Sequence, residues 1–334
     1  MDLKLVRAVL SLLISTISIV FVVSAALPTE AFTQELRTKV RISNTGFTIM
    51  GLPLLAAKDW GIFAANGVEV EYIVISASLA YPALAAGSLD YVAGVGPSST
   101  SATLSGIPLR AMWFSSDKAI YWLMARPQYK TLDSLRARKI GISAIGGANQ
   151  VSLLMALEKL GRNPKEYTML PLPGQDLLRS LESGFVDAAS LAPPAMFGAQ
   201  KKGFNKVLDM GAMQEMPTGG LTSLVKTLET RPAEVKRVIR SLQLAKQEIQ
   251  KSKDKSVDLI TRILKVDKET ALQTYDLYLT TLNPTGIPTQ AGMESVVKAL
   301  HMLGRFNDRK IAFTEIADDR LASEVAKEMG YKLQ

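Results

Sequence analysis

The same eight-residue pattern occurs twice in this sequence, at residues 83–90 and at residues 180–187. Each copy contains a small residue, Leu, two variable residues, Gly, one variable residue, an apolar residue and Asp. Leu packs a helix on a sheet, Gly ends the helix in the left-handed conformation, and Asp bonds backbone amides where the chain enters a strand. The repeat therefore predicts two similar lobes with a helix-to-strand turn at corresponding places.

Short apolar strands alternate with helical patterns around each copy, which is typical of parallel α/β units. In the first half we expect strands at 40–42, 68–75 and 90–93, and helices at 53–60, at 79–86 and from Pro97. In the second half we expect strands at 139–142, 167–170 and from 187, and helices at 148–160 and 175–182. The sequence thus predicts an α/β fold with two parallel-sheet lobes.

Two segments are expected to connect the lobes. Residues 113–125 leave the first lobe, and residues 221–224 return to it after Pro217-Thr218-Gly219-Gly220. Beyond this point the apolar spacing is helical to the end of the chain. We therefore assign 38–122 plus 222–334 to lobe 1, covered by the C-terminal helices, and 123–221 to lobe 2.

The first 26 residues have the layout of a secretory signal peptide. Lys4 and Arg7 precede the apolar run 8–23, and Ser24-Ala25-Ala26 supplies small residues for cleavage. We expect cleavage near Ala26 or Ala31 and a periplasmic, secreted protein. The alternative is an uncleaved anchor, although the run is shorter than the ~20 residues that span a bilayer.

Composition excludes several classes of site. The chain has no Cys, which rules out disulfides, thiolate metal sites, a Cys nucleophile and a lipid-modified Cys. Its one histidine, His301, lies in an apolar helical run, which favours a packed or surface side chain over a catalytic one. The net charge of +8 comes from Lys and Arg interleaved with Asp and Glu, which indicates a solvated surface rather than nucleic-acid binding. We predict no metal and no cofactor.

Uncharged hydrogen-bonding residues follow the predicted strands, where open parallel sheets bind ligands. The alternative for any one of them is ordinary helix capping. Gly146-Gly147 is too short to be a phosphate or dinucleotide motif. Phe47 and Trp113 are the aromatic residues chosen to cover a ring or an alkyl chain. The predicted ligand-binding residues are Phe47, Thr48, Ser76, Ser78, Gly96, Ser98, Ser99, Trp113, Ser143, Gly146, Gly147, Asn149, Pro194 and Thr218.

Several of these motifs together resemble one known family. They are residues 51–63 (GLPLLAAKDWGIF), residues 67–71 (GVEVE), and the Gly and Asp of each eight-residue repeat. Over 39–224 the chain resembles periplasmic binding proteins of the nitrate/sulfonate/taurine type, a group that includes binders of the thiamine pyrimidine precursor. The resemblance implies a type II periplasmic binding fold, with two lobes joined by two crossover strands. It also implies a monomer that captures a small-molecule solute between the lobes and delivers it to the permease and ATPase of an ABC importer.

Two departures from the family pattern bear on the solute. Ala77-Ser78 replaces a Gly-rich turn, and Pro193-Pro194 replaces an acidic residue followed by Pro. No Arg occurs in the predicted loops, which favours a neutral or weakly anionic organic solute over a strongly charged oxyanion. Two alternatives stay open. One is an extracytoplasmic sensor or interaction subunit, and the other is an enzyme on this fold, which fits a secreted chain without Cys poorly.

Overall fold

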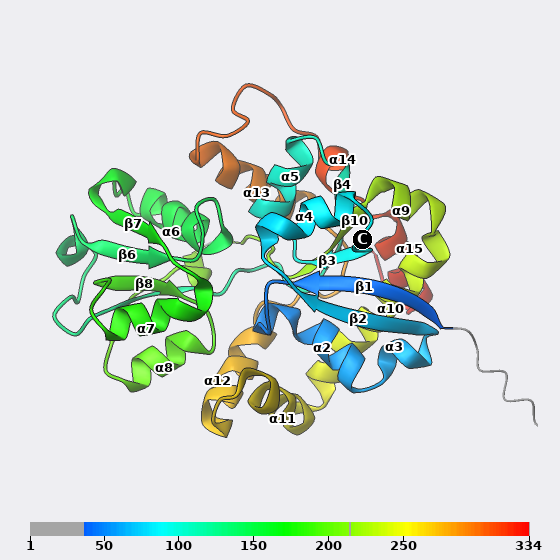
Figure 1. The fold of residues 1–334 in the computed structure, drawn as a ribbon, viewed down its shortest axis with the longest axis horizontal. Helices are drawn as coiled ribbons and strands as arrows, with labels where there is room; N and C mark the ends of the chain where they lie inside the picture. Colours follow the sequence, from blue (N-terminus) through cyan, green and yellow to red (C-terminus); the bar gives the residue numbers. More distant parts are fainter. Residues whose placement is uncertain (1–36, 214, 334) are drawn as a thin grey trace, which may run out of the picture. The chain divides into compact units, whose positions relative to one another are not determined.

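The computed structural model describes residues 37–213 and 215–333 (Figure 1). The predicted signal peptide and both cleavage sites lie outside the described residues. Within the described part, no helix combines the length and the apolar character needed to cross a bilayer.

Lobe 1 is built around a five-stranded sheet. The chain first forms β1 (Thr38–Asn44), the 3-10 helix η1 (Ile49–Gly51), α2 (Leu52–Asp59), α3 (Ile62–Ala65), β2 (Val68–Val74), α4 (Ala77–Ala85), β3 (Tyr91–Ala93), α5 (Pro97–Leu104) and β4 (Leu109–Phe114). After visiting lobe 2 it returns as β10 (Gly220–Leu224), α9 (Val225–Thr230), α10 (Pro232–Lys251), α11 (Lys253–Leu264), α12 (Lys268–Leu279), α13 (Gln290–Met302), α14 (Phe313–Ile316) and α15 (Arg320–Glu328).

Lobe 2 is built around a second sheet, also of five strands. Its elements are β5 (Trp122–Ala125), η2 (Asp133–Leu135), β6 (Lys139–Ile142), α6 (Ala148–Lys159), η3 (Pro164–Glu166), β7 (Thr168–Pro171), η4 (Gly174–Asp176), α7 (Leu177–Glu182), β8 (Ala188–Leu191), α8 (Ala195–Lys201), β9 (Asn205–Asp209) and η5 (Gly211–Met213). The predicted strand at 139–142 has the observed bounds, and the predicted helix at 148–160 is one residue longer than α6.

The two sheets have the same topology. Their strand orders are β2-β1-β3-β10-β4 and β7-β6-β8-β5-β9, so the two lobes correspond strand for strand. The prediction of similar lobes is confirmed. The prediction of wholly parallel sheets is wrong in one respect, because β10 and β5 run antiparallel to their neighbours. In each sheet the antiparallel strand is the first strand that the chain forms after it arrives from the other lobe. This strand begins at the carboxyl ends of the parallel strands, where the crossover segment reaches the sheet.

Sheet membership places the two crossover segments at 115–121 and 210–219. Trp122 is the first residue of β5 in the lobe 2 sheet, whereas the sequence placed it in lobe 1. Gly220 and Leu221 already belong to β10 in the lobe 1 sheet. The boundaries drawn from the sequence therefore differ from the sheet boundaries by one or two residues.

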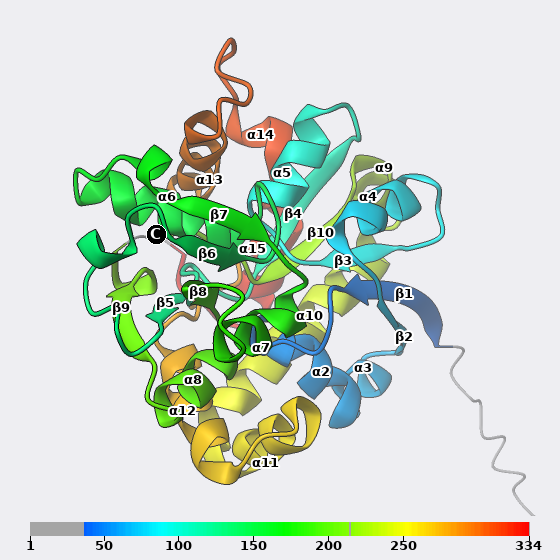
Figure 2. The same ribbon diagram turned by 60° about the vertical axis from the view of Figure 1, so that its left-hand side comes forward.

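Helices cover both faces of each sheet (Figures 1 and 2). On one face of lobe 1, Val40 and Ile42 of β1 join the core that α2 and α10 complete, with Val238 and Leu242 of α10 buried in it. In lobe 2, Met124 packs on the side of α7 and α8, while its neighbour Leu123 packs on the side of α6. Alternate residues of a strand point to opposite faces, so a strand buried on both faces is apolar throughout.

Two C-terminal helices also reach lobe 2. Lys298 on α13 pairs with Glu158 on α6, with Nζ 3.2 Å from Oε2. At the start of α12, Asp267 and Glu269 lie 3.0 and 2.8 Å from Nζ of Lys201 on α8. The C-terminal helices thus cover lobe 1, as predicted, and make additional contacts with the second lobe.

Candidate functional site

The carboxyl edge of the lobe 1 sheet gathers loops that are far apart in the sequence. β1, β2 and β3 are parallel, and β4 shares their direction because both β3 and β4 pair antiparallel with β10. The ends of these four strands and the start of β10 therefore lie at one edge. The segments collected there are 45–48, 75–76, 94–96, 115–116 and 218–219.

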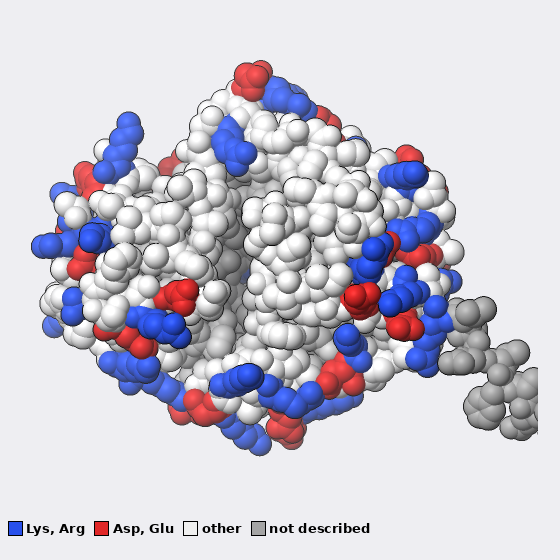
Figure 3. Space-filling model, in the orientation of Figure 1, with Lys and Arg blue, Asp and Glu red and all other residues white. Residues whose placement is uncertain are grey.

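Lobe 2 presents the equivalent edge. The loops 143–147, after β6, and 192–194, after β8, lie there together with Trp122 at the start of β5. β4 ends at the lobe 1 edge and β5 begins at the lobe 2 edge. The seven-residue crossover between these two strands keeps the two edges within about 25 Å of each other. Figure 3 shows a groove between the two lobes whose walls, on the face in view, consist mostly of uncharged residues.

At the lobe 1 edge, two hydroxyl groups lie against Met50; Ser116 is buried, and Thr218 is half-buried. The hydroxyls of Ser116 and Thr218 each donate to Sδ of Met50 at 3.5 Å. The backbone N–H of Gly219 donates to Oγ of Ser116 at 3.1 Å. Thr218 was predicted from the sequence. Ser116 and Met50 were not, because Ser116 follows a strand whose direction only the sheet pairing reveals.

An aromatic pair stands at the same edge. Phe47 and Tyr72 stack with ring centroids 5.5 Å apart and an interplanar angle of 13°. The hydroxyl of Tyr72 donates to the carbonyl of Gly46 at 2.8 Å. Burial raises the pKa of Tyr72 to about 12, so this hydroxyl stays a donor at physiological pH. Phe47 is 56% exposed, so its ring presents a free surface to solvent.

The start of α5 depends on a glycine. Gly96 has φ +112°, and a Cβ at this position would lie 2.9 Å from the carbonyl oxygen of Pro217 in the returning crossover. The hydroxyl of Ser99 donates to the carbonyl of Gly96 at 3.0 Å, and Ser99 is buried. The Ser99 hydroxyl is therefore held by the backbone at the start of the helix, whereas Ser98 is half-buried beside it. Of the predicted pair, Ser98 is the better placed to meet a solute.

In lobe 2, the predicted residues divide into a structural and an accessible set. Asn149 is buried; it accepts from the hydroxyl of Ser143 at 2.8 Å and donates to the carbonyl of Ser190 at 3.4 Å. Its amide thereby ties α6 to β8. Ser143 is exposed, and the N–H of Gly146 is already taken by Oε1 of Gln150 at 2.6 Å.

The remaining predicted residues are placed as follows. Ser76 and Ser78 are exposed and their hydroxyls lie 3.0 Å apart. Thr48 and Pro194 are half-buried, and Gly146 and Gly147 are buried. Trp113 is 2% exposed in the lobe 1 core, where its Nε1 donates to Oε1 of Gln243 at 3.3 Å. Trp113 points away from solvent and we leave it out of the candidate site.

Arg305 is a residue that the sequence analysis missed. It follows α13 in lobe 1, yet its Nη1 lies 3.6 Å from the position of a Cβ on Gly146 in the lobe 2 loop. Arg305 is exposed, and within 37–213 and 215–333 it forms no ion pair with a carboxylate. The tertiary structure thus brings a cation beside a loop that is itself uncharged.

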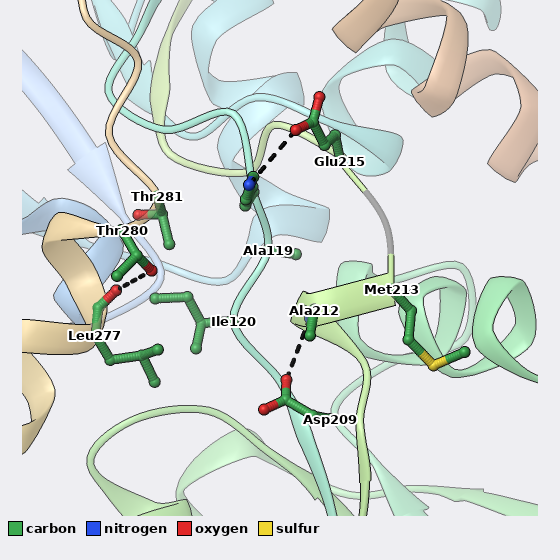
Figure 4. Close-up of a pocket in the computed structure, with 11 residues that line it drawn as sticks. Ala119, Ile120, Asp209, Ala212, Met213, Glu215, Leu277, Thr280 and Thr281 are labelled. Carbon is green, nitrogen blue, oxygen red and sulfur yellow. Dashed lines mark hydrogen bonds and ion pairs between the residues drawn. The ribbon is translucent and has the colours of Figure 1, made fainter.

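A separate cavity of about 390 Å³ lies where the crossovers meet α12 (Figure 4). Its lining includes Ile120 from the first crossover, Ala212 from the second and Thr280 after α12. Lys118 and Glu215 pair across it at 3.5 Å. None of the residues predicted from the sequence lines this cavity, so it is distinct from the groove residues described above.

Comparison with known families agrees with this architecture. The profile described as NMT1/THI5 like matches residues 50–256, more than half of the chain. This chain belongs to the NMT1/THI5 like family. The match starts at Met50 and runs through lobe 2 into α11, whereas the loop 45–48 and Arg305 lie outside the matched range.

Individual relatives of this NMT1/THI5 like chain are distant in sequence. A protein of Brucella abortus (strain 2308), named as a binding protein, is 25% identical over 64% of this chain and 67% of its own length. The periplasmic aliphatic sulphonate binding protein SsuA of Escherichia coli superposes with a TM-score of 0.68 at 17% identity, over 84% of this chain and 92% of that one. The periplasmic nitrate-binding protein NrtA of Synechocystis PCC 6803 gives 0.69 at 14%, over 88% and 89%.

One further solved structure is that of a DSZB mutant in complex with biphenyl-2-sulfinic acid. It superposes with a TM-score of 0.64 at 15% identity, over 87% of this chain and 99% of that one. At these identities the structural matches establish the fold alone. The predicted periplasmic-binding-protein fold and the predicted family resemblance are both confirmed.

Proposed function

We propose that this protein is the extracytoplasmic solute-binding component of an ABC importer. The observation that carries the proposal is the pair of facing carboxyl edges, joined by two crossovers and lined by uncharged hydrogen-bonding groups. Each edge offers only part of the contacts, so a solute touching both edges stabilises the closed arrangement of the lobes over the open one. The membership of the NMT1/THI5 like family and the names of the relatives support the same role.

The solute is a small polar or weakly anionic organic molecule, bound and released without chemical change. Ser76 and Ser98 of lobe 1, Thr218 of the second crossover and Ser143 of lobe 2 supply hydroxyls, and Arg305 supplies one cation beside the lobe 2 loop. The protein acts as a periplasmic monomer after loss of its signal peptide. Its partners are the permease and ATPase in the inner membrane. The chain has no Cys and only one His, which argues against covalent or general-base catalysis in the groove.

The test is a thermal-shift screen of the purified protein against sulfonates, nitrate, aromatic carboxylates and pyrimidines. A solute that binds only the native state raises the melting temperature, with a size set by its concentration relative to Kd. The double variant Ser98→Ala with Gly147→Val is expected to weaken capture of the hit about tenfold or more. Its circular dichroism and its melting temperature without solute serve as the folding control.

Two results contradict the proposal. Turnover of a bound compound by the purified protein indicates an enzyme. An unchanged affinity in the double variant moves the binding site away from this groove.

A further inference from the structure

Several large hydrophobic side chains are exposed near the carboxyl ends of strands in the two sheets. Of the exposed side chains of this kind in the described part of the chain, Phe47, Val74 and Ile145 end or directly follow strands at the two carboxyl edges, and Leu79 lies in the first turn of α4, after β2. Large apolar side chains left exposed in loops where such sheets bind ligands favour contact with an apolar part of the solute.

The Phe47–Tyr72 pair gives this apolar edge a defined shape. The two rings are almost parallel, and Tyr72 is anchored through its hydroxyl to Gly46 in the Phe47 loop. One face of Phe47 is therefore covered by Tyr72, and the 56% exposure of Phe47 leaves the opposite side free. Aromatic rings pack best in offset stacks or edge-to-face, so the free face favours a third ring over a branched alkyl group.

Charge at the edges limits what the ring can carry. The segments 44–48, 75–79, 94–99 and 143–147 contain no Asp, Glu, Lys or Arg. Arg305, beside Gly146, is a cation that the structure places against one of these loops. A solute with several ionised groups would lose its hydration without matching partners. Arg305 can compensate one acidic group.

We propose that the solute contains a flat aromatic or conjugated ring that stacks on the free face of Phe47 and bears no more than one acidic group. Ile145, 75% exposed on the lobe 2 edge, is the apolar residue that covers the ring when the lobes close. This inference rests on the proposed function and specifies its solute. It excludes nitrate and short straight-chain sulfonates as the preferred solutes.

The experiment compares compounds that share one acidic group and differ in flatness. Benzoate is paired with cyclohexanecarboxylate, benzenesulfonate with cyclohexanesulfonate, and nitrate and taurine complete the set. Isothermal titration with the full protein gives each Kd. A stacking preference of about two- to tenfold for the flat member of each pair is expected.

Three variants locate the preference. Phe47→Ala is expected to lower affinity for the flat compounds about tenfold and to remove the preference for flat over non-flat compounds. Phe47→Leu keeps an apolar side chain but is also expected to remove this preference, because it has no ring to stack on. Phe185→Ala is the matched control. Phe185 is 55% exposed, almost the same as Phe47, but it lies before β8 at the opposite edge of its sheet, so its removal leaves every affinity unchanged.

The outcomes separate this inference from the proposed function. If nitrate or taurine binds more tightly than every ring compound, the ring inference is wrong and the solute-binding function stands. The same holds if Phe47→Ala binds flat compounds as well as the wild type does, because the apolar edge then serves another contact, such as the permease. If none of these compounds binds and the broader thermal-shift screen also finds no solute, both the function and the inference fail.

Discussion

Asp90 and Asp187 make the same backbone contacts in the two lobes. Asp90 accepts from the N–H of Arg41 in β1 at 2.8 Å, and Asp187 accepts from the N–H of Lys139 in β6 at 3.1 Å. In return, the N–H of each aspartate donates to the carbonyl of the same partner at 2.9 Å. The repeated sequence pattern therefore marks a turn after a helix that is hydrogen-bonded to β1 in lobe 1 and to β6 in lobe 2.

The two aspartates differ in their surroundings, which leads to a first prediction. Asp90 also accepts from both terminal guanidinium nitrogens of Arg231 at 3.1 Å and its side chain is 12% exposed. Asp90→Ala leaves a backbone N–H without its acceptor and leaves Arg231 paired with Glu234 alone, and we expect a loss of about 3 kcal/mol in the free energy of unfolding. Asp187→Ala, at a more exposed position, is expected to cost about 1 kcal/mol. Urea unfolding of both variants measures the difference, and equal losses would contradict it.

Gly96 and Gly106 provide a second, matched test. Their φ angles are +112° and +108°, but only at Gly96 does an added Cβ meet backbone, at 2.9 Å from the carbonyl oxygen of Pro217. Gly106→Ala is expected to cost about 1 kcal/mol from backbone strain alone. Gly96→Ala adds a clash that pushes the returning crossover away from α5, so it should cost more and also weaken solute capture. Melting temperatures and the Kd of the screening hit check both effects. Equal melting temperatures would show that the crossover moves away from the added Cβ without loss of stability.

The buried lysine below the first crossover gives a prediction about pH. Lys246 is almost fully buried, its Nζ donates to the carbonyl of Asn283 at 2.5 Å, and burial lowers its pKa to about 7 while the nearby Asp117 carboxylate opposes the shift. In the unfolded chain a lysine titrates near a pKa of about 10.4. Between about pH 7 and pH 10 the unfolded state therefore binds more protons, and this residue makes stability rise with pH by about 1.4 kcal/mol per unit.

Lys246→Met removes that dependence. The free energy of unfolding of the wild type minus that of the variant is expected to increase from about pH 7.5 to about pH 9.5. Taking the difference cancels titrating groups that the two proteins share. A difference that stays constant over this range would mean that Lys246 keeps its charge in the folded protein.

Arg305 is expected to select for anionic solutes. Arg305→Gln should lower the affinity for an anionic hit about tenfold at low salt, and by less in high salt, where the interaction is screened. Affinity for a neutral analogue should be unchanged. Arg309→Gln is the control, because Arg309 lies in the same segment but is paired with Glu315. An equal effect of both variants would indicate a general charge effect instead of a contact with the solute.

Local patterns predicted much of this fold. The strand at 139–142 and the helix predicted at 148–160, observed at 148–159, follow from apolar spacing and from Gly161 as a helix stop, because these signals act over a few residues. The antiparallel strands β5 and β10 could not be assigned a direction in this way. Their direction depends on which edge of the sheet the chain crosses, and no local residue records that choice.

The residues of the candidate site also differ in whether local sequence patterns can predict them. Phe47, Ser76, Ser98 and Ser143 were chosen because each follows a predicted strand, and their contact with a solute stays a prediction. Trp113 was misplaced, since its sequence neighbours cannot show that α10 covers it.

The amino-acid sequence by itself determined the two similar lobes, the uncharged loops after their strands and the family to which the chain belongs. Only the tertiary structure decided which side chains meet. It placed Arg305, from the far end of the chain, beside Gly146, and it joined Met50 to Ser116 and Thr218. The physical reason is that helix and strand signals come from neighbouring residues, whereas contacts across the groove come from the packing of elements that the chain reaches only after crossing between lobes.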